Sequence, residues 1–148
     1  MLTRRTALGL IAATPLFARP AFAASPEVFA IDGVAIRGAD PVAFFTEGAP
    51  VIGSADHALM WKGAAWHFTS AENMAKFEAD PAAYAPQYGG YCAFAASKGA
   101  VATTVPEAWT VYEDKLYLNY STNVRSIWLQ DVPGNIALAD GNWPGILG

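Results

Sequence analysis

Three side chains of this chain have the chemistry to hold a transition metal. They are the single cysteine, Cys92, and the two histidines, His57 and His67. Thiolate and imidazole are the ligands that zinc and copper prefer, so copper and zinc are the candidate ions. No two of the three stand at the paired spacing of a closed zinc site, which would need carboxylates as further ligands. The alternative is that each histidine is a surface or hydrogen-bonded strand residue.

Cys92 has two interpretations. The small apolar residues 93–96 favour a buried thiol that packs as a small hydrophobic group. Its place after Gly89-Gly90, in the first turn of a predicted helix, favours a functional thiol, because helix N–H groups stabilise a thiolate. Tyr88 and Tyr91 flank the cysteine and are candidates to line a small ligand pocket, although tyrosines at such loose spacing also pack in cores.

Asp40 is the candidate carboxylate. It precedes Pro41 and is predicted to cap a short helix over 40–45, and the alternative is a buried carboxylate near a binding site. We name Tyr88, Tyr91, Cys92 and Asp40 as candidate ligand-binding residues. The chain has no phosphate-binding loop, dinucleotide fingerprint or H-E-x-x-H motif, and it gives no positive sign of an enzyme.

Residues 1–23 predict a signal peptide, followed by one domain over 24–148. Arg4-Arg5 precedes the short apolar run 7–17, and Ala21-Phe22-Ala23 fits a cleavage site. The paired arginines favour twin-arginine export, with ordinary secretion as the alternative, and either route predicts a periplasmic or secreted protein.

Charge narrows the expected partners. The whole chain has a formal charge of −4, and because residues 24–148 hold 6 basic and 13 acidic residues, the mature charge is −7. An acidic domain without a basic patch is not expected to bind nucleic acid. After the signal no apolar run is long enough to span a membrane, and a single cysteine forms no internal disulfide.

The pattern of short strands and capped helices predicts a small α+β domain of antiparallel hairpins with several short helices. Two hairpins are expected, with turns at Lys62-Gly63-Ala64 and Glu113-Asp114-Lys115, and Ser70 and Ser121 are expected to cap two of the helices. Expected strands are 28–31, 34–36, 57–61, 65–69, 109–112 and 116–119, and expected helices are 40–45, 71–79, 92–97, 121–130 and 135–139. We expect three apolar side chains to share the inner face of the first long helix (Ala71, Met74 and Phe77) and three that of helix 121–130 (Val124, Ile127 and Trp128). Pro133-Gly134 is expected to separate the last two helices.

Strand alternation places the two histidines differently. His67 stands between Trp66 and Phe68, whose rings should face the core, so its side chain is expected on the opposite face. His57 has the parity of Leu59 and Trp61 and is expected to face inward.

A long string of motifs resembles an exported bacterial subgroup of YHS-domain proteins. The resemblance rests on Asp40-Pro41-Val42-Ala43, Lys62-Gly63, His67-Phe68-x-Ser70, Phe77, Asp80-Pro81, residues 84–92 and Leu116-Tyr117-Leu118-Asn119-Tyr120. It implies a small module that is often tied to metal handling. In metal-associated relatives two cysteines stand at the positions that Thr69 and Asn73 occupy here.

Three hypotheses follow. The first is a periplasmic YHS-type module that binds a metal ion or small ligand near Cys92. The second is a structural or interaction module that has kept the fold and lost the ligands, as Thr69 and Asn73 suggest. The third, the least favoured, is a thiol-based redox protein that uses Cys92.

Overall fold

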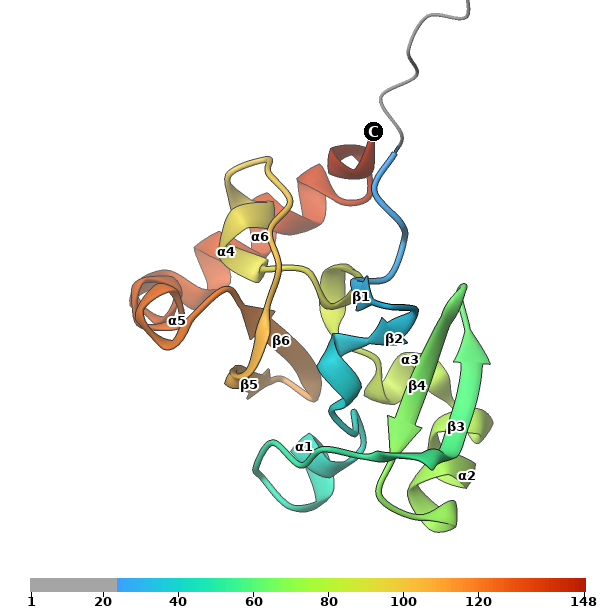
Figure 1. The fold of residues 1–148 in the computed structure, drawn as a ribbon. Coiled ribbons are helices and arrows are strands. Elements are labelled where there is room, and N and C mark those ends of the chain that lie inside the picture. The colour runs from blue at the N-terminus through green and yellow to red at the C-terminus, as the bar shows by residue number, and fades with distance from the viewer. Residues whose placement is uncertain (1–23) are drawn as a thin grey trace, which may run out of the picture.

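The computed structural model describes residues 24–148, and the predicted signal peptide lies outside this range. The domain is α+β, as predicted, with two sheets and short helices packed around them (Figure 1). The larger sheet has the strand order β1-β2-β4-β3, and the smaller pairs β5 with β6. The strands are β1 Ala30–Ile31, β2 Val34–Ala35, β3 Ser54–Trp61, β4 Ala64–Phe68, β5 Val105–Tyr112 and β6 Lys115–Asn119.

The two predicted hairpins form, β1 and β2 pair as a third, and the chain reverses in each through backbone with positive φ. At the β3–β4 turn Lys62 has φ 49° and Gly63 has φ 79°. Two successive residues of this kind match the right-handed twist of the paired strands. The sheet is not wholly antiparallel, because β2 runs parallel to β4, with Val34 opposite Ala65.

Two of the helices begin at the serine caps that the sequence predicts. Ser70 Oγ accepts the Asn73 N–H at 3.1 Å, and Ser121 Oγ accepts the Val124 N–H at 3.1 Å. Each cap satisfies a backbone donor that has no partner inside the helix. The helices are α1 Ala43–Thr46, α2 Ala71–Ala79, α3 Pro81–Tyr84, α4 Ala93–Ser97, α5 Thr122–Trp128 and α6 Val132–Asn142, with short 3-10 turns at 36–38, 87–90, 129–131 and 145–147.

Several helix boundaries differ from the prediction, and the start of α6 has a clear physical reason. Pro133 and Gly134 lie in the first turn of α6 and do not precede it. Proline is tolerated there because the first turn needs no N–H from it, and Asp131 Oδ1 accepts the Gly134 N–H at 3.0 Å as a cap.

Two helix faces also differ. The side chain of Ile127 is exposed, and Trp128 alone of the predicted face of α5 is fully buried. On α2 the residue buried beside Phe77 is Asn73, whereas Ala71 is exposed. Periodicity favours apolar residues at such positions, and Asn73 is buried because a carboxylate from another segment meets its amide group.

The core consists of two neighbouring clusters. The first packs the larger sheet, α1 and α2 around Trp66, Phe68 and Phe77, and the second packs β6 and α4–α6 around Trp128. Trp143 packs against both clusters. Within residues 24–148 no helix is long and apolar enough to cross a membrane.

Candidate functional site

A cavity of about 190 Å³ opens where four distant parts of the chain meet. These parts are the segment before β1, the β3–β4 turn, the stretch from α3 to Gly89, and Trp143 after α6. Its lining combines four aromatic side chains with one acidic and one basic side chain, namely Trp61, Trp66, Tyr88, Trp143, Glu27 and Lys62. An aromatic cavity with few polar groups is the usual form of a small-molecule site.

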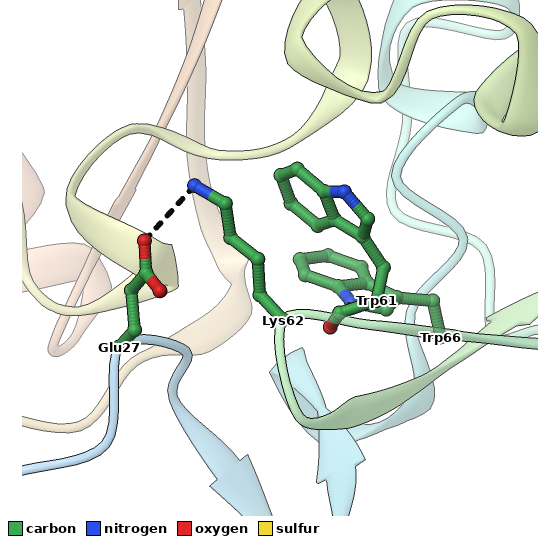
Figure 2. A network of polar contacts seen from close by, with 4 residues as sticks. All are labelled: Glu27, Trp61, Lys62 and Trp66. Carbon is green, nitrogen blue, oxygen red and sulfur yellow. Dashed lines mark hydrogen bonds and ion pairs between the residues drawn. The ribbon is translucent and has the colours of Figure 1, made fainter.

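Lys62 connects the acidic and aromatic parts of the lining. Its Nζ lies 3.0 Å from Glu27 Oε1 and 4.7 Å from the centre of the Trp61 ring. Figure 2 shows the lysine side chain extended beside the two tryptophans toward the carboxylate. The tight turn at Lys62-Gly63 places the lysine side chain at the cavity. The β3–β4 hairpin therefore supplies the positive charge of the lining.

The tryptophans are held by contacts of their own strands. Trp66 Nε1–H donates to the Trp61 carbonyl oxygen at 3.1 Å, and the two rings meet edge to face with centroids 5.7 Å apart. Phe77 packs against both rings from α2. Rings fixed in this way give the cavity a preformed wall.

Tyr88 forms another part of the wall and turns its hydroxyl away. Its OH donates to Asp140 Oδ1 at 2.9 Å, and its ring centre lies 6.0 Å from that of Trp143. Burial, followed by the hydrogen bond and the charge of Asp140, raises the pKa of Tyr88. The phenol is therefore neutral at physiological pH.

The Gly89 bend holds the acidic side of the cavity in place. Gly89 has φ 63°, its carbonyl accepts the Phe29 N–H at 2.8 Å, and a Cβ built on it would collide with the Glu27 carbonyl oxygen. Only glycine permits this approach of two backbones.

Asp40 lies elsewhere, fully buried at the junction of α1, β4 and α2. Its Oδ1 accepts the Val42 N–H at 2.8 Å and the Ala43 N–H at 3.3 Å in the turn that leads into α1, and Oδ2 accepts three donors. These are the Thr69 N–H at 2.8 Å, the Thr69 hydroxyl at 3.0 Å and the Asn73 amide at 2.8 Å. Asp40 is thus buried and accepts the backbone donors ahead of α1, but it does not line the cavity.

The same geometry decides what Thr69 and Asn73 can bind. Both residues donate hydrogen bonds to the Asp40 carboxylate, and each of its two oxygens already accepts at least one hydrogen bond. A transition metal needs ligand lone pairs aimed at it. Thr69 and Asn73 therefore do not fit the metal ion that the resemblance implies. They belong instead to a hydrogen-bond network around the Asp40 carboxylate.

Cys92 is buried at the start of α4. Its Sγ accepts the Tyr120 N–H at 3.3 Å and the Ala95 N–H at 3.5 Å, and it lies 3.5 Å from Asn119 Oδ1. Asn119 is itself fully buried. The thiol therefore acts as a helix cap and as core packing, and it does not line the cavity.

The remaining predicted residues are not gathered with Cys92. Tyr91 is buried, and its hydroxyl donates to the Pro26 carbonyl at 2.7 Å. His67 lies on the face of β4 opposite Trp66 and Phe68, as predicted. On β3 His57 is half-buried, as are Leu59 and Trp61. Among the residues described, no three histidine, cysteine or acidic side chains are grouped so as to hold a metal ion. A metal-ligand role for Cys92, His57 and His67 stays a prediction.

Of the four predicted ligand-binding residues, Tyr88 alone lines the cavity. Sequence reasoning missed Glu27, Trp61, Lys62 and Trp143. The one local signal was Lys62-Gly63 at the turn of an aromatic hairpin. Glu27 and Trp143 had none, because they reach the cavity only through the closing of the whole fold.

Residues 42–88 match the family model of the YHS domain. No curated protein and no solved structure matches the chain. The YHS match includes Trp61, Lys62 and Tyr88, whereas Glu27 and Trp143 lie outside it. The cavity is thus built partly by the segment that matches the YHS domain and partly by flanking residues.

Proposed function

We propose that this protein is a YHS-type binding module that takes a small ligand in the cavity between the β3–β4 turn and the Gly89 bend. The observation that carries the proposal is the preformed aromatic wall of Trp61, Trp66 and Tyr88 around about 190 Å³. Typical drug-sized ligands need pockets of roughly 300 Å³ or more, so the ligand is a smaller molecule. This moves the expected site from Cys92 to the cavity beside Tyr88.

A screen of small polar and aromatic fragments by ligand-observed NMR tests this function. Ala82 lies on α3, is exposed and lines the cavity, so A82L should fill the space and abolish fragment binding without disturbing the core. Ala83, its exposed neighbour, does not line the cavity, and A83L is the matched control. Fragments that bind wild type, A83L and A82L equally would disprove the site.

A second function is favoured by the Asp40 network, which occupies the positions of the implied metal ligands. On this alternative the module is structural or interacts with another protein, and holds no metal. Elemental mass spectrometry of the untagged protein and of C92A tests it. Near one equivalent of copper or zinc in the wild type, lost in the variant, would reject the metal-free alternative and support a metal ligand role for Cys92.

We further propose export to the periplasm by the twin-arginine route, supported by Arg4-Arg5 and the cleavage pattern at 21–23. Replacing both arginines by lysine keeps the charge of the segment. Loss of export in this variant supports the twin-arginine route, and unchanged export supports ordinary secretion.

A further inference from the structure

We propose that the ligand of the cavity is a small organic cation, an alkylated ammonium, and that the Lys62 ammonium occupies its place in the free protein. This inference rests on the proposed binding function and names its ligand class. The observation behind this proposal is that Lys62 Nζ lies close to both the Trp61 ring and the Glu27 carboxylate.

The aromatic wall and the carboxylate together favour a positive charge. An ammonium within about 6 Å of an aromatic centroid is attracted by the ring face, most strongly by tryptophan. Lys62 Nζ meets this condition at 4.7 Å from the Trp61 ring. Glu27 supplies a counter-charge 3.0 Å from the same nitrogen. The chain's own cation thus marks a position with the chemistry of an ammonium site.

Lys62 can be displaced at small cost. The side chains of Lys62 and Glu27 are 44% and 56% exposed. Ion pairs at such exposed positions contribute little to stability, because water screens them and the long side chains lose freedom. A ligand with its charge buried among methyl groups contacts the ring face more fully than a hydrated lysine ammonium, while the released lysine returns to water.

An anionic ligand fits the cavity less well. Two ring donors of the lining are already used, since Trp66 Nε1–H donates to the Trp61 carbonyl and the Tyr88 hydroxyl donates to Asp140. Glu27 would repel it. The formal charge of −7 over residues 24–148 also favours the approach of cations over anions.

Calorimetric titration with choline, and with its uncharged analogue in which carbon replaces the quaternary nitrogen, tests the inference. We expect choline to bind, with its methyl proton signals shifted upfield by the tryptophan rings, and the analogue to bind more weakly. K62M removes the competing cation and keeps the apolar stem, so it should tighten choline binding roughly three- to tenfold. E27Q should weaken it by a similar factor.

Lys98 provides the matched control. Its Nζ lies 5.2 Å from the Phe94 ring and outside the cavity lining, so K98M should leave choline binding unchanged. Absence of choline binding to wild type and K62M overturns the cation inference. Equal binding of choline and the uncharged analogue also overturns it, but leaves the proposed binding function intact. Failure of every fragment in the screen with A82L and A83L would instead reject the binding function itself.

Discussion

Asp40 is a single side chain on which three segments depend. Its buried carboxylate receives donors from the start of α1, from the residue after β4 and from α2. D40A leaves these donors buried without an acceptor, so we expect the free energy of unfolding to fall by about 3–5 kcal/mol. D40N should lose most of this stability too, because an amide NH₂ would face some of the donors. Urea unfolding measures both losses.

Asp131 gives the control for the Asp40 prediction. It also caps a helix start, through the Gly134 N–H, but it is exposed. D131A is therefore expected to cost only about 1 kcal/mol. A loss in D40A no larger than that in D131A would show that the buried network contributes nothing beyond a cap.

Cys92 is predicted to be inert in the folded protein. The residue is 1% exposed, and its thiol sulfur accepts hydrogen bonds from the Ala95 and Tyr120 N–H groups. An aromatic disulfide reagent should therefore react only as fast as the protein opens, and at once in denaturant. The chromophore released by the reagent follows both rates. Rapid stoichiometric reaction without denaturant would restore the thiol-based redox hypothesis.

The Gly89 bend, which follows the segment that matches the YHS domain, packs closely against the residues before β1. G89A would force a Cβ into the Glu27 carbonyl and leave alanine with φ near 63°. We expect a loss of more than about 2 kcal/mol, together with loss of ligand binding as the acidic rim moves. Thermal unfolding and the choline titration measure the two effects.

Gly141 is the control for Gly89. It lies in α6, and a Cβ built there meets nothing within 4 Å. Alanine is a better helix former than glycine, so G141A should raise stability by about 0.5–1 kcal/mol. Similar destabilisation by G89A and G141A would contradict the close-approach argument.

Local rules predicted the elements well and the cavity poorly. Ser70 and Ser121 were identified as caps, and Lys62-Gly63 as a hairpin turn, because each depends on neighbours within a few residues. Pro133 was misplaced because proline both ends helices and begins them. The partners of Glu27 and Trp143 depend on contacts between distant segments, which neither periodicity nor capping encodes.

The core of the whole domain also depends on contacts between distant segments. The YHS match ends at Tyr88, but the first core cluster also includes Phe29 before the match, and Leu116 and Leu118 after it. These residues share one buried cluster with Trp66, Phe68 and Phe77 of the matched segment. The flanking segments are therefore part of the core and of the cavity, so the folding unit is larger than the matched segment.

Tyr117 and Tyr88 couple the stability of the whole molecule to alkaline pH. Burial, followed by the charges of Asp140 and Glu113, raises the pKa of Tyr117 to about 12, and burial also raises that of Tyr88. Both phenols stay protonated in the folded state while the unfolded chain ionises near pH 10. The contribution of these tyrosines to the free energy of unfolding is therefore complete below pH 10 and falls between pH 10 and about 12, by about 1.4 kcal/mol per pH unit for each tyrosine.

Urea unfolding across this range measures the loss. The free energy of unfolding should fall less steeply with pH in Y117F than in wild type, and as steeply as in wild type in Y120F, in which the changed residue is exposed. An equal fall in Y117F and wild type would show that Tyr117 does not cause the loss.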